Sequence, residues 1–310
     1  MDATSQHDSD GQHDVDVVAV DFRDRSTDFS RIDRAVYEVE QQFRYSYPAP
    51  ICDLRQRLVV VPRLAHGDQR VLSHCLETSQ PHSRKRMCVD RFGNVIFEID
   101  IDKVEETVDF DVSLIVERLA GERPHVEAVT RQALETYLRP SALTRSNTTL
   151  RAVAADIACG GEQGTELAIA VGGWVFRWMT YAFDRTGVHT TAGQALAARH
   201  GVCQDYAHLM LALCRLLGIP ARYVSGYLVG EGGTHAWVEV LQPLSGGTAE
   251  IFAWDPTHDR PADARYVTVA VGRDYRDVAP VSGTCCGPHA GQLSTALRVT
   301  VSHTAREIAA

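Results

Sequence analysis

The sequence lacks the features that mark several large classes of protein. No apolar run approaches the roughly 20 residues that a membrane-spanning helix needs. Residues 1–16 contain no apolar segment behind a basic start, so we expect no ordinary secretory signal. Basic residues are in the minority, with 31 lysines and arginines against 40 aspartates and glutamates and a formal net charge of −9. This surplus of negative charge argues against nucleic acid or an anionic membrane as a partner.

The sequence also lacks the patterns of common metal and cofactor sites. Its cysteines form no paired Cys-x-x-Cys arrangement, and no glycine-rich phosphate-binding loop precedes a helix. We therefore expect no metal and no other cofactor. Cysteines scattered through a large chain without an export signal are typical of reduced thiols, which favours a cytoplasmic location. The eight cysteines are at positions 52, 75, 88, 159, 203, 214, 285 and 286.

What is present is the composition of a globular protein, with 45% hydrophobic and 23% charged residues. Residues 1–32 carry few large apolar side chains and are expected to form a mobile acidic tail. Residues 33–120 contain alternating apolar and polar positions, for example at 107–116, and a Gly-Asn turn at Gly93 between strand-like flanks. Several short strands at this spacing predict a β-sandwich-like N-terminal domain.

Residues 121–310 are expected to form an α+β domain in which helices come first, strands follow, and further strands end the chain. The third helix begins at Thr191, whose relation to Gln194 matches a capping box, and the fourth ends before Gly218. The patterns predict helices over 126–138, 166–183, 191–200 and 203–217, and strands over 222–229, 234–241 and 251–254.

Three residues in this second part have the types and the order of a nucleophilic site. Cys203 begins the fourth predicted helix, where the positive end of the helix macrodipole stabilises a thiolate. His235 and Asp255 lie on predicted strands that follow the helix. A histidine can take the proton of a thiol, and an acid can orient that histidine. A helix packed on an antiparallel sheet would bring the three together.

Neighbouring polar residues have simpler interpretations. Cys214 lies on the apolar face of the same helix and is expected to be an inert core thiol. His208 points away from the nucleophile and is expected to be structural, whereas Asp205 complements the helix N-terminus. His258 and Asp259 follow the last strand in a loop and are expected to lie on the surface.

Several segments resemble the transglutaminase-like superfamily, in particular its bacterial branch of candidate cysteine proteases with an N-terminal β region. The resemblance covers nearly the whole chain. It implies a papain-like transglutaminase core, with helices packed on an antiparallel sheet, preceded by a β-sandwich-like domain. The segments that carry it are Gly201–His208 around the cysteine, Leu217–Tyr227 after the helix, Thr234–Glu239, Trp254–Thr257 and Gly272–Val278.

The resemblance also implies roles. Cys203 would be the nucleophile, His235 the base and then the acid, and Asp255 the residue that orients the histidine. The backbone N–H of Cys203 is the natural donor to an oxyanion. A side-chain donor is not evident, because Trp174, Tyr181 and Gln194 are only weak candidates for that role.

Together these features predict a cysteine-dependent acyl-transfer enzyme that acts on amide or peptide bonds through a thioester. Water as the acceptor would make it a protease or amidase, and an amine acceptor would make it a transglutaminase; we favour hydrolysis. The expected partner is a peptide or protein substrate, with an amine as an alternative acyl acceptor. A non-catalytic peptide- or protein-binding module on the same fold is the rival interpretation. The complete triad argues against that rival.

Overall fold

The structure is a computed structural model that describes residues 14–15, 32, 34–119 and 124–305. The tail predicted over residues 1–32 lies almost wholly outside the described residues, so its mobility stays a prediction. Within the described segments, none of the helices has both the length and the apolar character that crossing a bilayer requires.

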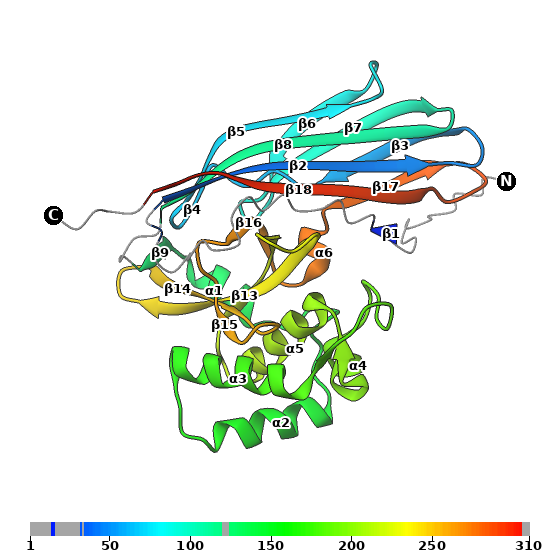
Figure 1. Cartoon of the computed structure of the whole chain (residues 1–310). Helices are drawn as coiled ribbons and strands as arrows, with labels where there is room; N and C mark the ends of the chain where they lie inside the picture. Colours follow the sequence, from blue (N-terminus) through cyan, green and yellow to red (C-terminus); the bar gives the residue numbers. More distant parts are fainter. Residues whose placement is uncertain (1–13, 16–31, 33, 120–123, 306–310) are drawn as a thin grey trace.

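Two β-sheets form a sandwich that contains most of the N-terminal part of the chain (Figure 1). In β2, Tyr37, Val39 and Phe43 are buried while Glu38 and Glu40 face outward. This period of two is what a strand with one covered face requires. The first sheet has the order β1 (Asp14–Val15), β18 (Gln292–Ala305), β2 (Arg34–Ser46), β8 (Thr107–Leu119), β5 (Gln69–Thr78) and β4 (Ala65–His66). The second has the order β17 (Val281–Cys286), β3 (Ile51–Leu58), β7 (Val95–Val104) and β6 (Arg84–Val89).

The last two strands, which the sequence pattern grouped with residues 121–310, belong to this sandwich. β18 pairs with β2 from Gln292 opposite Ser46 to Ala305 opposite Arg34. β17 pairs with β3 in the other sheet. An alternating pattern predicts a strand but does not identify a partner strand far away in the sequence, which explains the difference.

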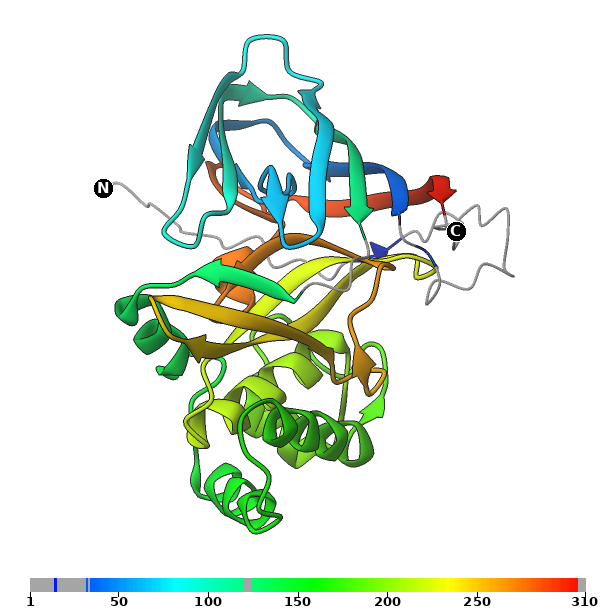
Figure 2. The ribbon, with the colours of Figure 1, turned by 90° about the vertical axis from the view of Figure 1, so that its left-hand side faces the viewer.

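Beneath the sandwich lies the core of the molecule, which is a further β-sheet covered by helices. Its strands run in the order β15-β14-β13-β12-β16, with β9 on the outer edge of β14. In Figure 1 this sheet lies between the sandwich and helices α2–α5, and Figure 2 shows the same layers from the side. The strands are β9 (His125–Ala128), β12 (Ala221–Leu228), β13 (Thr234–Leu244), β14 (Thr248–Asp255), β15 (Arg260–Pro261) and β16 (Tyr266–Gly272). The helices are α1 (Arg131–Leu138), α2 (Thr148–Ala158), α3 (Gly164–Trp178), α4 (Ala192–Ala198), α5 (Cys203–Leu216) and α6 (Tyr275–Val278).

Helix α5 is the central element of the core. Every residue from Gln204 to Arg215 is buried, because α2, α3 and α4 pack around it and β12 and β13 cover it from the sheet side. The predicted capping box at Thr191 and Gln194 is present at the start of α4, and Gly218 after α5 has a φ of 74°. The α+β, papain-like architecture expected from the sequence is confirmed.

Two helix predictions extend too far. Residues 126–138 divide into β9 and α1, because the Thr130 side chain accepts a hydrogen bond from Ala133 N and fixes the helix start there. Residues 166–183 end as a helix at Trp178; Met179 is extended, and β10 (Thr180–Tyr181) pairs with β11 (His200–Gly201). In both cases a strand partner distant in sequence overrides a helical apolar spacing.

Side-chain amides join the sandwich to the core sheet. Gln69 donates to the carbonyl of Thr268 at 2.7 Å and accepts from its N–H at 2.8 Å. Asn94 makes the same pair of bonds with Val271, both at 2.8 Å. Both partners lie on β16, the edge strand of the core sheet, so the two amides satisfy backbone groups that an edge would leave unpaired.

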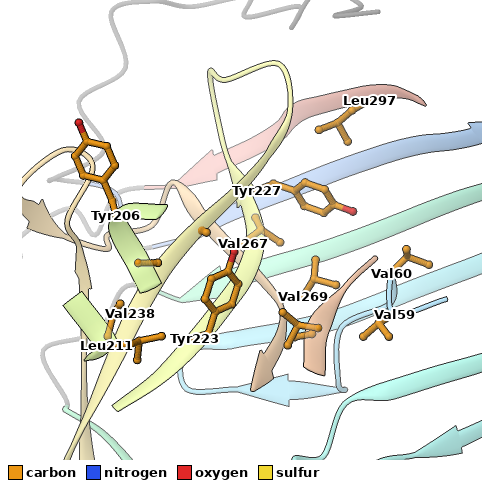
Figure 3. Packing of buried hydrophobic residues seen from close by; sticks show 14 of the residues in the cluster. Val59, Val60, Tyr206, Leu211, Tyr223, Tyr227, Val238, Val267, Val269 and Leu297 are labelled. Atoms are coloured by element: carbon orange, nitrogen blue, oxygen red, sulfur yellow. The ribbon is translucent and has the colours of Figure 1, made fainter. Parts of the chain in front are cut away.

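The hydrophobic core is continuous across this junction. One cluster of buried side chains includes Val59 and Val60 after β3, Val267 and Val269 of β16, and residues of α5 (Figure 3). The sandwich therefore packs on the core as part of a single hydrophobic interior.

Candidate active site

The structure places Cys203 at the first position of α5. Val202 is extended, and its N–H donates to the Asp205 carboxylate at 2.9 Å, which also accepts from the Thr186 hydroxyl at 2.7 Å. A Cβ at Gly201 would overlap that carboxylate, so this position requires glycine. The role predicted for Asp205 at the helix N-terminus is confirmed, and the first-turn N–H groups beside Cys203 have no acceptor within the helix.

The sheet brings His235 and Asp255 to the same place from neighbouring strands. His235 is near the start of β13 and Asp255 ends β14, and these strands run antiparallel. His235 Nε2 lies 2.8 Å from Asp255 Oδ2. Cys203 lies close enough to His235 to help raise the pKa of the imidazole. Since Nε2 faces the aspartate, Nδ1 is the nitrogen left to face the sulfur. The three residues predicted from the sequence are thus in contact.

Asp255 is the most heavily bonded carboxylate of the site. Besides His235, it accepts from the Tyr266 hydroxyl at 2.7 Å and from Thr257 N at 2.8 Å, and His258 Nδ1 lies 2.8 Å away. Burial alone would raise the pKa of Asp255, but the hydrogen bonds from His235, His258 and Tyr266 hold it below the usual range. The carboxylate is therefore ionised at neutral pH.

His235 is held in its protonated form. Burial alone would lower its pKa, but its interactions with Asp255, Cys203 and Glu231 outweigh burial and keep the pKa well above its usual value. The ring is stacked on Trp237, with centroids 6.3 Å apart. An imidazolium beside a cysteine is the arrangement that stabilises a thiolate.

Two further residues, which the sequence did not indicate, belong to the site. Glu231, in the loop between β12 and β13, has Oε2 3.3 Å from His235 Nδ1 and Oε1 3.0 Å from His258 Nε2. His258 was expected to be a surface residue outside the site; it is partly exposed, but it bridges Asp255 and Glu231 and so belongs to the site. These two carboxylates raise the pKa of His258 to about 9. The glycines at 230, 232 and 233 were the one available sign of a specialised loop here.

An aromatic shelf lies beside the cysteine. Tyr181 on β10 is opposite Gly201 on β11, and its ring meets that of Phe183 edge-on with centroids 5.2 Å apart. Both rings are exposed, Phe183 by 71%. Of the weak candidates for a side-chain oxyanion donor, Gln194 is used in the α4 cap and Trp174 stacks on Trp178. Tyr181 is the candidate that the structure brings beside the cysteine.

Two other expectations for the helix hold. His208 is fully buried, and its Nε2 accepts a hydrogen bond from Tyr275 N at 3.1 Å, so it is structural. Cys214 is fully buried as well, and burial raises the pKa of its thiol to about 12.

In two clusters of the described residues, atoms that can bind a metal lie close together. In each cluster a proton or a guanidinium already occupies the position that a metal would take. In the first, the protonated imidazoles bind the Asp255 carboxylate. In the second, Arg222 donates two hydrogen bonds to Glu127, at 2.9 and 3.1 Å. We interpret both as ion-pair networks. Their members are His235, Asp255 and His258, and His66, His125 and Glu127.

Comparison with known proteins gives matches over most of the chain. Residues 151–247 match the model of the transglutaminase-like superfamily, and residues 37–117 match that of the bacterial transglutaminase-like N-terminal region. An uncharacterized protein of Mycobacterium leprae is 34% identical over 275 residues, which cover 83% of this chain and 95% of that protein.

Two further similarities are informative. A crystal structure from Cytophaga hutchinsonii, of a "putative cysteine protease", has a TM-score of 0.69 at 22% identity and covers 88% of this chain and 92% of its own. A protein-glutamine gamma-glutamyltransferase of Pseudomonas aeruginosa is 32% identical over 96 residues, which are 27% of this chain and 14% of that protein. From the family models and the Mycobacterium leprae relative, the chain belongs to the transglutaminase-like superfamily.

Proposed function

We propose that this protein is a cysteine-dependent acyl-transfer enzyme that cleaves amide bonds through a thioester on Cys203. The observation that carries the proposal is the juxtaposition of Cys203, at the N-terminus of a buried helix, with His235, which is hydrogen-bonded to Asp255. A nucleophile, a base within reach and a group that orients the base are the requirements for covalent catalysis.

The steps follow from which atoms face each other. The Cys203 thiolate attacks the amide carbonyl carbon, and the Cys203 backbone N–H stabilises the oxygen as it becomes negative. His235 gives its Nδ1 proton to the nitrogen as the C–N bond breaks, so the amine leaves and the thioester remains. Water then attacks the thioester and gives a proton to the neutral imidazole. The sulfur leaves as a thiolate, and the imidazolium is restored.

Water is the acceptor in this proposal, because Cys203 is partly exposed at the surface of the core and water therefore has access to the thioester. The similarity to a protein-glutamine gamma-glutamyltransferase makes an amine the second acceptor to test. The two outcomes separate when a glutamine-containing protein such as casein is incubated with the enzyme, with and without a fluorescent primary amine. Hydrolysis releases peptides or converts glutamine to glutamate, whereas amine transfer makes the casein fluorescent; ammonia leaves a glutamine side chain in both cases.

The first test measures the activation of the thiol itself. Wild-type protein is treated with iodoacetamide between pH 5 and pH 9, and the rate at each cysteine is read by peptide mass spectrometry. We expect Cys203 to react well below pH 8, and this reactivity to be lost in His235→Ala but kept in the control His74→Ala on β5. If Cys203 reacts as slowly as the buried Cys214, with or without His235, the protein is a binding module rather than an enzyme.

A cytoplasmic location is part of the proposal. All eight cysteines are free thiols in the structure, which suits a reducing compartment. Fractionation of cells that express the protein, with cytoplasmic and extracytoplasmic markers, tests the location directly.

A further inference from the structure

A second carboxylate stands on the substrate side of His235. Asp255 holds Nε2, the nitrogen that faces away from the nucleophile, whereas Glu231 Oε2 lies 3.3 Å from Nδ1. Nδ1 is the atom that exchanges a proton with the amine side of the amide in the proposed reaction. Glu231 is therefore next to the place where that amine leaves or enters.

The backbone holds Glu231 in this position. Glu231 N donates to Leu228 O at 3.0 Å and closes a tight turn, in which Gly230 has a φ of 101° that other residues rarely adopt. The turn directs the side chain toward His235, four residues later on β13. This geometry fixes the carboxylate by a local hydrogen bond as well as by its ion pairs.

His258 fixes the other end of the side chain. Its Nε2 lies 3.0 Å from Glu231 Oε1 while its Nδ1 binds Asp255 at 2.8 Å. The contact of Oε1 with His258 is thus shorter than the contact of Oε2 with His235. Oε1 can stay anchored while Oε2 turns to a substrate. Glu231 is 39% exposed in its side chain, whereas His235 and Asp255 are buried, so Glu231 is the acid that solvent reaches.

Charge in the site is unbalanced on that side. When Cys203 is a thiolate, the directly bonded group holds three negative charges, on Cys203, Asp255 and Glu231, and two positive charges, on His235 and His258. Arg260 donates to the Tyr266 hydroxyl at 2.9 Å. The Glu231 end of this group is the exposed one, with 39% of its side chain accessible, so a cation from solvent approaches there.

Resting on the proposed acyl transfer at Cys203, we propose that Glu231 is a specificity-determining residue, which selects substrates with a positively charged group on the amine side of the amide. The group is an ammonium or guanidinium, held by Oε2 beside His235. The exposed shelf of Tyr181 and Phe183 offers an apolar surface to the alkyl or aromatic stem that carries such a charge.

The test uses small thiol reagents that differ in charge and need no knowledge of the substrate. Methanethiosulfonates with an aminoethyl (cationic), sulfonatoethyl (anionic) or methyl (neutral) group each convert a thiolate to a mixed disulfide and release methanesulfinate. Rates at Cys203 are read by peptide mass spectrometry in the full-length protein at low salt. We expect Glu231→Gln to lower the cationic-to-anionic rate ratio about 10-fold, since a charge this close changes the local concentration of both reagents.

Matched variants separate a charge effect from a loss of structure. Glu250→Gln removes an exposed carboxylate at the far end of β14 and should leave the ratio unchanged. Glu231→Lys should reverse the preference. The wild-type ratio should also fall as salt is raised.

Each outcome has one meaning. A fast neutral reagent together with a ratio that depends on Glu231 supports the inference. A fast neutral reagent with the same ratio in wild type and Glu231→Gln overturns it and leaves the proposed acyl transfer intact. A neutral reagent that labels Cys203 no faster than the exposed Cys159 overturns both.

The cation on the amine side comes either from a peptide substrate or from an amine acceptor, and two assays distinguish these sources. In peptides cleaved by the enzyme, a basic residue directly after the cleaved bond should lower KM compared with alanine, and Glu231→Gln should remove that difference. In amine transfer, the acceptors to compare are a diamine and a monoamine of equal length whose second end is an uncharged ether. The diamine should be the better acceptor, and Glu231→Gln should remove that advantage.

Discussion

At the scale of single residues, Asp255 controls the site because four groups donate to one carboxylate. Asp255→Asn keeps the shape but removes the charge and half of the acceptor capacity, so His235 loses its orientation and its stabilised positive charge. By analogy with the same change in serine proteases, where the loss is about 10⁴-fold, we expect the rate of Cys203 alkylation at pH 7 to fall at least about 10-fold.

The matched control is Asp259→Asn. Asp259 has a φ of 51°, a conformation that asparagine also tolerates, so this change should not disturb the loop. Equal alkylation rates in wild type and Asp255→Asn would contradict the role given to Asp255.

His258 predicts a pH dependence of stability. Its pKa is about 9 in the folded protein, because of its hydrogen bonds to Asp255 and Glu231, against about 6.5 in an unfolded chain. Its contribution is therefore fully present below pH 6.5 and is lost as the pH rises through 9. Asp255 and Glu231 stay ionised across this window in both states and do not contribute to the change.

We expect the free energy of unfolding of wild type to exceed that of His258→Gln at pH 6, and the difference to shrink toward pH 9.5. Urea denaturation with a reductant present measures it. His235 is common to both proteins, so its own titration largely cancels. A difference that stays constant with pH would mean that these carboxylates do not raise the pKa of His258.

Residue identity allowed part of this site to be predicted. Cys203, His235 and Asp255 could be found because each lies in a short recognisable segment on a well-marked helix or strand. Glu231 and His258 could not, because their role depends on the contact between two loops that are distant in sequence. In sequence, a glutamate among glycines and a histidine after a strand both look like surface residues.

At the scale of elements, a buried ion network joins β12, β13 and β9 to the sandwich. Arg222 on β12 donates to Glu239 on β13 at 2.6 Å and to Glu127 on β9. His66, on β4 of the sandwich, places Nε2 2.6 Å from Glu239. Burial lowers the pKa of His66 despite this carboxylate, so His66 serves as a neutral donor. Because β13 also carries His235, this network fixes the strand that positions the base.

Removing Arg222 should therefore be costly. Arg222→Met leaves Glu239 buried without its main cation and removes one of the cations that bind Glu127, and such a loss costs about 3–5 kcal/mol. Arg84→Met on β6 removes an exposed ion pair with Asp102 and should cost only about 0–1 kcal/mol. Chemical denaturation of the two variants makes the comparison. Similar values for both would show that the buried network does not stabilise the strands.

Elements were easier to predict than their ends and partners. The alternating strands of the sandwich and the buried helix α5 have periodic patterns that are strong enough to be read directly. The first residues of the 126–138 segment and the last of the 166–183 segment are apolar at helical spacing, yet they pair with strands. The decision depends on β14 and β11, which no local pattern reveals.

At the scale of the whole molecule, the chain closes on itself. The described chain runs from β2 to β8 through the sandwich, builds the core, and returns through β17 and β18 to pair with β3 and β2. Between these passages, Gln69 and Asn94 bind the edge strand of the core sheet, and the Tyr37 hydroxyl donates to Ala264 O at 2.6 Å. The sandwich cannot be complete before the core has been synthesised, so the two parts should fold as one unit.

This coupling can be measured because the two parts carry different probes. All four tryptophans, Trp174, Trp178, Trp237 and Trp254, lie in the core. Tryptophan fluorescence therefore reports on the core alone, whereas the far-UV circular dichroism of strands reports largely on the sandwich. In wild type the two unfolding transitions should coincide, as for a single cooperative unit.

Gln69→Ala should weaken the junction. It leaves the buried N–H and C=O of Thr268 without their partners, at a cost of about 1–3 kcal/mol for each unsatisfied group. Gln80→Ala is the matched control, since Gln80 donates to Thr107 O at an exposed position within the sandwich and should lose less than about 1 kcal/mol. In Gln69→Ala we expect the unfolding transitions seen by both probes to shift together to a lower urea concentration. If the junction is the weakest contact, the two transitions should separate instead. Separate transitions in wild type would show that the sandwich and the core are independent units, and the return of β17 and β18 would then close the chain without coupling its stability.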